Sequence, residues 1–335
     1  MTQEKVLEID QLKTYFQTKK GVGKVVDGID LVLHKGETLG IVGESGCGKS
    51  MTSLSILQLI PDPGKIVDGS IRLNNEELIG KSEKQMRTIR GNQISMIFQE
   101  PMTSLNPVIS VGEQIAETIR EHQGLSRKQA FKKSIEMLEL VGIPSPEQRA
   151  KQEPFQLSGG MRQRVMIAMA LACNPEVLIA DEPTTALDVT IQSQIIKLMK
   201  DLQKKLNMGV VFITHDLGVV AETCDKVAVM YAGEIVEYST TEELFRHPKH
   251  PYTKGLLRSL PKLYEDQEEL LAMEGNIPSP FKEHQGCKFA DRCPIVEESC
   301  HQTHPNLKVS TDESYQVRCL LHQDEKEFKK GVSIS

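Results

Sequence analysis

Apolar and polar positions alternate over residues 5–42, as in half-buried strands, and the alternation ends in the apolar run 38–42 before a glycine-rich turn. We therefore expect short strands at the N-terminus, the last of which leads into that turn. After the turn, residues 51–60 are apolar enough for a helix, and Pro61 and Pro63 end it.

Residues 110–152 have helical periodicity and many charges, with breaks at Gly124 and Gly142. They predict an inserted helical subdomain that covers about residues 100–165. From residue 165 the pattern becomes helix, strand 177–181, helix 191–206 and strand 209–214, an alternation typical of a parallel sheet covered by helices. The predicted fold class is α/β.

The composition changes after Phe245, where histidine, proline and polar residues become frequent. We place a domain boundary there, with a first domain over residues 1–245 and a smaller C-terminal extension over residues 246–323. The last residues, 324–335, are rich in lysine and glutamate and are expected to be disordered.

The composition of the 335 residues excludes several classes of protein. A hydrophobic content of 39% can form a real core, and the net charge of −6 gives no positive field for nucleic acid. The N-terminus shows no secretory signal, and the longest apolar run, residues 165–173, is less than half of the ~20 residues of a membrane span. Seven cysteines in such a chain indicate a reducing compartment.

The glycine-rich turn over residues 43–50 fits the phosphate-loop pattern G-x-x-x-x-G-K-[ST]. Its glycines allow successive backbone N–H groups to turn toward phosphate oxygens, and the following helix points its positive end at the same anion. Lys49 supplies a charge for the β- and γ-phosphates, and Ser50 can bind Mg²⁺. We expect the following residues to bind the nucleotide: Gly43, Glu44, Ser45, Gly46, Cys47, Gly48, Lys49, Ser50 and Met51.

A second motif, residues 177–182, is an apolar strand that delivers two acids at its end, where ligands of parallel sheets gather. Asp181 is the candidate for the Mg²⁺ shell, and Glu182 for polarising the attacking water. An acidic pair after a strand is by itself more often a helix cap or a solvated turn. The phosphate loop upstream favours the catalytic interpretation.

Further motifs follow in a fixed order. Residues 157–163 read Leu-Ser-Gly-Gly-Met-Arg-Gln, Gln99 follows a strand, residues 186–188 read Ala-Leu-Asp, and His215 follows the strand 209–214. With these motifs the sequence resembles the ABC ATPase family over almost all of residues 5–240.

The resemblance implies roles for these residues. Ser158, Gly159, Gly160 and Gln163 belong to a signature that closes over ATP bound by a second ATPase subunit. Gln99 contacts Mg²⁺ and water, Asp188 lies in a dimer-contact loop, and His215 is a switch histidine beside the γ-phosphate. Phe16 is expected to stack on adenine, with Tyr15 as the alternative. The implied fold is a P-loop core with an N-terminal antiparallel β subdomain.

Residues 246–253 and 286–294 resemble the tail of the oligopeptide, dipeptide and nickel importer branch. This resemblance implies an ATPase that powers peptide uptake at the cytoplasmic face of a bacterial or archaeal membrane. The implied partners are two permeases, an extracytoplasmic binding protein and a second, related ATPase. The alternatives are a nickel or other small-solute importer, or a soluble non-transport ABC ATPase; a single cassette without a long insertion argues against the latter.

Four cysteines, Cys287, Cys293, Cys300 and Cys319, lie in the last fifty residues with the spacing C-x5-C-x6-C-x18-C. This spacing lacks the C-x2-C pairs usual for structural zinc. All-thiolate ligation can hold a [4Fe–4S] cluster, which the resembling subunits also suggest, while zinc and free thiols stay open. Cys173 and Cys224 are expected to be buried thiols, and His250 to shape a turn rather than bind metal.

Overall fold

Strands and helices alternate along residues 4–99, 104–184, 188–259, 273–310 and 315–322, which are the residues that this computed structural model describes. They form two compact units. Unit 1 comprises residues 1–7, 33–37 and 73–212, and unit 2 comprises residues 8–32, 38–72 and 213–335. The C-terminal extension is thus grouped with the phosphate loop. The boundary at residue 245 stays a prediction.

Most of a four-stranded sheet lies in unit 2, with the order β2-β1-β4-β5. Its strands are β1 (Lys5–Thr18), β2 (Gly21–His34), β4 (Gly64–Leu73) and β5 (Glu76–Glu77). Two residues join β1 to β2, so these two strands run antiparallel. The expectation of short strands was wrong here, because within residues 5–34 only positions 19 and 20 form a turn.

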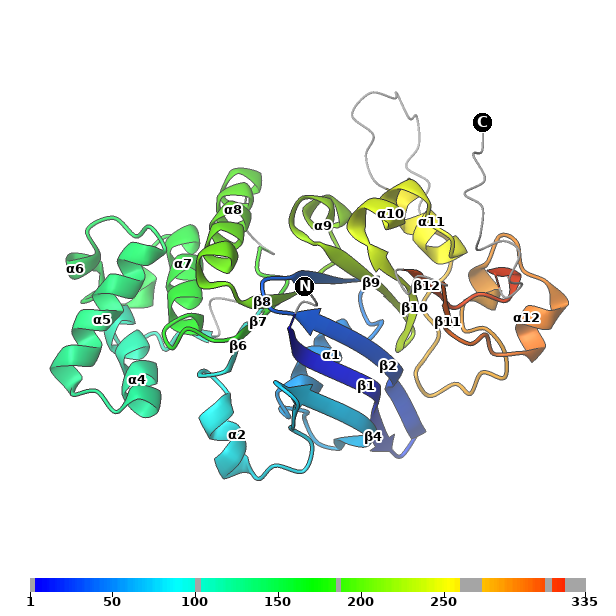
Figure 1. Cartoon of the computed structure of the whole chain (residues 1–335), viewed down its shortest axis with the longest axis horizontal. Coiled ribbons are helices and arrows are strands. Elements are labelled where there is room, and N and C mark those ends of the chain that lie inside the picture. Colours follow the sequence, from blue (N-terminus) through cyan, green and yellow to red (C-terminus); the bar gives the residue numbers. More distant parts are fainter. Residues whose placement is uncertain (1–3, 100–103, 185–187, 260–272, 311–314, 323–335) are drawn as a thin grey trace. The chain divides into compact units, whose positions relative to one another are not determined.

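A second group of strands in unit 2 carries the glycine-rich turn. β3 (Thr38–Val42) runs parallel to β9 (Lys226–Tyr231), which pairs antiparallel with β10 (Glu234–Thr240). The C-terminal extension continues these strands, since β12 (Tyr315–Val317) pairs with β10 and with β11 (Lys308–Val309). Figure 1 shows β9, β10 and β12 side by side. All five residues of β3 are buried.

Helices follow these strands in unit 2. Helix α1 begins at the end of the glycine-rich turn and ends before the predicted limit at residue 60. Helix α9 follows β8 (Gly209–Thr214), and the last two residues of β8 belong to this unit. The helices are α1 (Lys49–Ile56), α9 (Leu217–Thr223), α10 (Thr241–Arg246), α11 (Pro251–Arg258), α12 (Glu298–Gln302) and the 3₁₀ turns η2 (Ala290–Arg292) and η3 (Leu320–His322).

Unit 1 joins parallel strands to a group of helices. β6 (Ile94–Ile97) runs parallel to β7 (Val177–Asp181), with Ile97 opposite Ala180. The α/β class is therefore confirmed, with parallel strands and long helices such as α8 in the same chain. The remaining elements of unit 1 include the helices α2 (Glu83–Ile89), α4 (Val111–Gln123), α5 (Arg127–Leu140), α6 (Pro146–Arg149), η1 (Pro154–Gln156), α7 (Gly159–Ala170) and α8 (Val189–Leu206).

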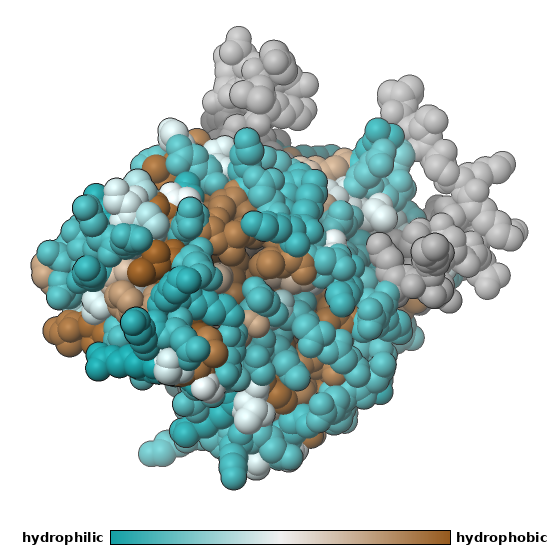
Figure 2. All heavy atoms as spheres, turned by 60° about the vertical axis from the view of Figure 1, so that its left-hand side comes forward, coloured by the Kyte–Doolittle hydropathy of each residue, from teal (hydrophilic) through white to brown (hydrophobic). Residues whose placement is uncertain are grey.

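The predicted break at Gly124 is confirmed, because this residue ends α4 in the left-handed region with φ 63°. Helix α4 packs against α5 and α7, and Figure 1 shows the three together. Figure 2, which brings this side forward, shows brown apolar areas among the teal surface. Val108 and Phe155 in this unit are 81% and 71% exposed. Among the described residues, no helix has the length and apolar character that a bilayer span requires.

Candidate active site

The glycine-rich turn in unit 2 connects the end of β3 to the start of α1. A Cβ atom at Gly43 would lie 2.2 Å from the Met230 carbonyl oxygen, and one at Gly48 would lie 2.5 Å from the Val25 carbonyl oxygen. Gly48 also has φ 113°, so its backbone favours glycine. The close approach of neighbouring strands therefore requires glycine at these two positions, whatever the turn binds.

Lys49 is buried inside this turn. Its Nζ donates to the carbonyl oxygens of Gly43 at 2.7 Å and Glu44 at 3.0 Å, and Lys49 as a whole is only 6% exposed. Ser45, Gly46 and Ser50 are exposed. The turn thus presents an exposed backbone and a hydroxyl on its outer side while it holds a cation on its inner side, which suits an anion such as a phosphate.

Cys47 takes a structural place in the same turn. Cys47 is 1% exposed, and its carbonyl oxygen accepts from the Gly233 N–H at 2.8 Å. Its Sγ lies 3.9 Å from Lys49 Nζ. Burial raises the pKa of the thiol. A neutral, buried sulfur is poorly placed for regulation by oxidants.

Glu44 links the turn to the C-terminal extension. Its backbone N–H donates to the Tyr252 hydroxyl at 2.9 Å, and its carboxylate binds the Arg292 guanidinium at 2.8 and 2.9 Å. Tyr252 lies in α11 and Arg292 ends η2. A hollow of about 510 Å³ borders the turn here, and its lining comes from residues 44–46, residues 275–280, Met273 and Arg292.

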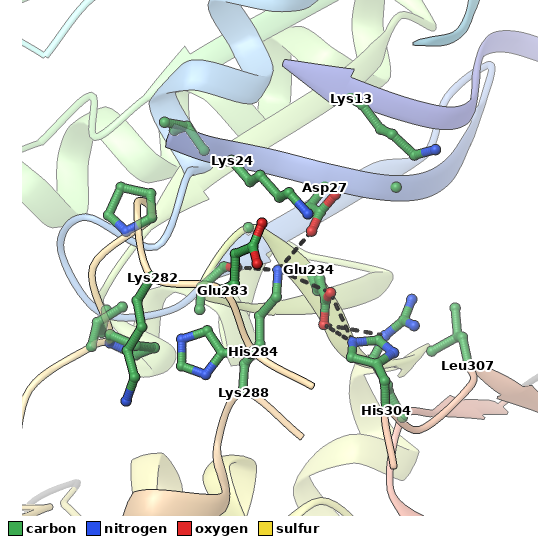
Figure 3. Close-up of a pocket in the computed structure, with 18 of the residues that line it drawn as sticks. Lys13, Lys24, Asp27, Glu234, Lys282, Glu283, His284, Lys288, His304 and Leu307 are labelled. Atoms are coloured by element: carbon green, nitrogen blue, oxygen red, sulfur yellow. Dashed lines mark hydrogen bonds and ion pairs between the residues drawn. The ribbon is translucent and has the colours of Figure 1, made fainter. Parts of the chain in front are cut away.

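A larger cavity of about 790 Å³ lies beside the same turn, between β1 and β2 and the extension (Figure 3). Lys288 Nζ lies 2.9 Å from both Asp27 Oδ2 and Glu234 Oε1, and His304 Nε2 lies 3.0 Å from Glu234 Oε1. Burial opposes ionisation of Glu234, but His304, Lys288 and Arg318 lower its pKa overall. These charged groups compensate one another and join the extension to the strands.

The acidic strand end lies in unit 1. Asp181, the last residue of β7, is buried, and Glu182 follows it with φ 46°. Gln99 comes just after β6, the parallel neighbour of β7, and its Nε2 donates to Glu182 Oε2 at 3.0 Å. Because the two strands end at the same edge, the predicted glutamine and the predicted base meet side chain to side chain.

The signature residues form the start of α7 in unit 1. Ser158 is the N-cap residue, and its hydroxyl accepts from the Met161 N–H at 3.3 Å. Ser158 and Gly159 are exposed, and Gly160 lies against Ile191 of α8. Gln163 is buried and its Nε2 donates to the Pro183 carbonyl oxygen at 2.5 Å, next to the acidic pair. The exposed helix start can receive an anion from outside.

Asp188 and His215 are the remaining predicted polar residues. Asp188 is exposed and caps α8, where its Oδ1 accepts from the Ile191 N–H at 2.9 Å. Its motif neighbours Ala186 and Leu187 lie outside the described residues. His215, in unit 2, is exposed after β8 and directly precedes Asp216, the N-cap residue of α9.

The two aromatic candidates for adenine stacking have different surroundings in unit 2. The Tyr15 hydroxyl donates to Asp27 Oδ1 at 2.5 Å, and Lys24 Nζ lies 5.9 Å from the centre of its ring. The Phe16 ring lies 2.6 Å from where a Cβ at Gly64 would be. Burial, followed by the bond to Asp27, raises the pKa of Tyr15. These contacts do not decide whether Tyr15 or Phe16 is the residue that stacks on adenine.

The four tail cysteines are free thiols. Burial raises the pKa of Cys287 to about 11, and the nearby Cys319, Cys300 and Cys293 add to this rise. Across the residues that the structure describes, however, no set of three or more histidine, cysteine, aspartate or glutamate side chains is arranged to hold a metal ion. The arrangement therefore does not support the predicted [4Fe–4S] cluster.

The other cysteine and histidine predictions have mixed outcomes. Cys224 is buried as expected, and burial raises its pKa to about 12, but Cys173 is only half-buried. His250 shapes the start of α11, because its Nδ1 accepts from the Tyr252 N–H at 3.1 Å.

Sequence reasoning missed Tyr252 and Arg292 as partners of the turn. Both belong to stretches that stood out only as tail motifs, residues 246–253 and 286–294. Contact with Glu44 across 208 and 248 positions has no local signal in one sequence.

Comparison with known proteins finds two matching family regions and relatives that share about half of this chain's residues. The chain matches the ABC transporter family over residues 26–185, and the oligopeptide/dipeptide transporter C-terminal region over residues 236–300. It is 51% identical to the oligopeptide transport ATP-binding protein AppD of Bacillus subtilis, over 96% of this chain and 98% of that protein. It is 52% identical to the dipeptide transport ATP-binding protein DppD of the same organism, over 96% of both chains.

Solved structures show the same fold. The dimeric ATP-binding cassette MJ0796, in a post-hydrolysis state bound to ADP and Pi, is 27% identical and aligns with a TM-score of 0.63, over 70% of this chain and 98% of that one. The cbiO1 subunit of the cbiONQ transporter complex from Clostridium perfringens is 29% identical, with a TM-score of 0.62, over 73% of this chain and 92% of that one.

Proposed function

Because this chain belongs to the ABC transporter family and carries its oligopeptide/dipeptide C-terminal region, we propose that it is the ATP-hydrolysing subunit of a peptide importer. The chain is an ATPase whose hydrolysis is coupled to transport. The observation that carries the peptide assignment is the identity of about half of all residues, over nearly the whole chain, to two ATP-binding proteins named for oligopeptide and dipeptide transport.

The chemistry follows from the residues already described. We assign Lys49 and the loop N–H groups to the phosphates, and Ser50, Asp181 and Gln99 to the Mg²⁺ that the nucleotide brings. Glu182 orients and polarises the attacking water, and its bond to Gln99 supports that role, since the amide fixes the position of one carboxylate oxygen. We assign His215 to the γ-phosphate.

A second ATPase subunit is part of the proposal. The signature start at Ser158 and the cap residue Asp188 are exposed, so both can meet the nucleotide or surface of another subunit. We propose a head-to-tail pair in which each signature closes over the ATP held by the opposite phosphate loop, with a related chain as the partner. Hydrolysis then reopens the pair and moves the attached permeases.

The permeases are the proposed membrane anchor, and an external binding protein delivers the substrate. Exposed apolar side chains in unit 1, namely Phe98, Val108 and Phe155, support a protein-docking role for this unit. We accordingly propose that the chain works as a peripheral subunit on the cytoplasmic face of the cell membrane.

The [4Fe–4S] cluster stays a proposal that rests on the four tail cysteines of the sequence, with zinc or free thiols as the alternatives. Burial raises the pKa values of Cys287, Cys293 and Cys319, and the N–H two residues later offsets part of this rise in each. Such N–H groups stabilise thiolates, the form that binds iron. Anaerobically purified protein is expected to contain iron and sulfide; metal analysis that finds neither contradicts the cluster.

Purification from membranes tests the transport assignment. A tagged copy of the full chain, extracted in mild detergent, is expected to retain two permeases and a related ATPase, identified by mass spectrometry. Reconstituted with the binding protein, this complex should take up labelled di- or oligopeptides and not Ni²⁺. Uptake of Ni²⁺ alone would assign the small-solute alternative, and a chain without permeases would contradict the importer.

A further inference from the structure

Glu44 is held through its side chain and both of its backbone polar groups, and all of these contacts lie in unit 2. Arg292 Nη1 donates to Glu44 Oε2 at 2.8 Å and Nη2 donates to Oε1 at 2.9 Å, so the ion pair is bidentate. The Glu44 N–H donates to the Tyr252 hydroxyl, and the Glu44 carbonyl accepts from Lys49 Nζ at 3.0 Å. One loop residue thus connects the extension to the phosphate-binding lysine.

Arg292 is itself fixed before it reaches Glu44. Its side chain is only 6% exposed, its Nε donates to the Glu274 carbonyl at 2.9 Å, and its guanidinium lies 5.7 Å from the centre of the Tyr231 ring. Glu44 raises its pKa further. A guanidinium held by a backbone carbonyl and an aromatic ring has little freedom left, so its planar donors set the position of the carboxylate.

The aromatic side chains around this arginine form a rigid support. Tyr231 contacts Tyr252 at 4.7 Å and Phe289 at 5.2 Å between ring centres, both in edge-to-face geometry. All three rings are almost fully buried. The hydroxyl of Tyr252 and the guanidinium of Arg292 therefore reach Glu44 from one packed cluster, formed by the extension and β9.

The two ends of the segment that carries Arg292 are both fixed on unit 2. At one end Lys288 binds Asp27 and Glu234, as Figure 3 shows, and at the other end Arg292 binds Glu44. An exposed ion pair contributes little to stability, but loss of one partner from a buried pair leaves an uncompensated charge. The Arg292–Glu44 pair has one buried member, so its removal should disturb the loop.

We propose that Arg292 is a positioning residue for the bound nucleotide. By fixing both carboxylate oxygens of Glu44, it keeps the loop in the conformation in which its N–H groups and Lys49 meet the phosphates. Arg292 does not contact the reacting atoms. The inference rests on the nucleotide-binding role of the loop proposed above, and it assigns to the C-terminal extension a direct part in ATP binding.

The test compares Mg·ATP binding by the full chain and its variants. Arg292→Gln and Glu44→Gln are each expected to raise the Kd about tenfold, and the double variant is expected to be no worse than either single one, because both remove the same pair. Arg292→Lys, which cannot bind both oxygens, should lie between wild type and Arg292→Gln. The matched control is Arg246→Gln, which removes an exposed ion pair to Glu242 in the same unit.

A purely structural role predicts a different pattern. In that case Arg292→Gln lowers the melting temperature while its folded form binds Mg·ATP as wild type does, and this result would overturn the proposal. Additive losses in the double variant would overturn it as well. Failure of the wild-type chain to bind Mg·ATP would instead remove the proposed function, so the two failures are distinguishable.

Discussion

The Gln99 amide donates a hydrogen bond to the Glu182 carboxylate at 3.0 Å, although 83 positions separate the two residues. Gln99 follows β6 and Glu182 follows β7, and the parallel pairing of these strands brings them together. The contact fixes the position of one carboxylate oxygen of Glu182. It also explains how the Gln99 amide and the Glu182 carboxylate can act together on one water molecule.

Substitution Glu182→Gln tests the catalytic base. The amide preserves the size of the side chain and can still accept from Gln99, but it cannot take a proton from water. We expect Mg·ATP affinity within about twofold of wild type and a kcat lower by about 10²-fold or more. Phosphate release by the assembled transporter gives kcat; hydrolysis at a near-normal rate would remove Glu182 from this role.

Two glycines of the phosphate loop should respond differently to alanine. Gly46→Ala adds a methyl group with no atom within 4 Å, so only its positive φ of 84° costs energy, about 1–2 kcal/mol. Gly48→Ala also places a Cβ 2.5 Å from the Val25 carbonyl oxygen. Urea unfolding of both variants measures the difference. Equal losses of stability would contradict the close strand contact.

His250 should make stability depend on pH. Burial lowers its pKa to about 3, and its Nδ1 must stay unprotonated to accept from Tyr252. The unfolded chain binds the proton near pH 6.5, so this contribution is complete above that pH and is lost as the pH falls toward 3. Between pH 7.5 and 5.5 the loss in unfolding free energy is about 1 kcal/mol.

Paired variants isolate this contribution from the other ionisable groups. Glu237, whose pKa burial raises, acts in the opposite direction, because its stability contribution falls as the pH rises above its unfolded value. His250→Asn keeps a cap acceptor without a titrating group and should flatten the pH dependence. His247→Asn, at an exposed position, should leave it unchanged. The same slope in all three proteins would refute the assignment.

Cys47 should be chemically silent in the folded protein. Its thiol is buried and has a raised pKa, whereas Cys173 is only half-buried. We expect maleimide at pH 7.5 to modify Cys47 at least tenfold more slowly than Cys173, as read by peptide mass spectrometry, and at a similar rate in urea. Loss of ATP affinity on mild oxidation, with modification at Cys47, would show that the thiol is accessible.

Local chemistry was predictable from the sequence where it depends on neighbours in the chain. Gly43, Gly48 and Lys49 lie within one short motif, and the acid pair after residues 177–180 forms another. Each of the two motifs follows an apolar strand that marks its place. The break at Gly124 is likewise local, since a left-handed residue ends the helix. Such features need only backbone geometry and spacing.

Long-range packing was not predictable in the same way. The bonds from Tyr252 and Arg292 to Glu44 depend on the aromatic cluster of Tyr231, Tyr252 and Phe289, which no window of sequence shows. Four cysteines in the tail indicated metal binding, yet spacing cannot say whether their side chains converge. Tyr15 and Phe16 are neighbours in one strand, so the pattern places them on opposite faces without choosing between them.

Equilibrium binding of Mg·ATP to the full chain, with Lys49→Ala as the comparison, tests the central claim most directly. We predict saturable binding by the wild-type protein in the micromolar to millimolar range that is usual for enzymes, and a Kd at least tenfold higher without the Lys49 ammonium. Absence of binding by the wild type, or equal affinity in both proteins, would contradict the account.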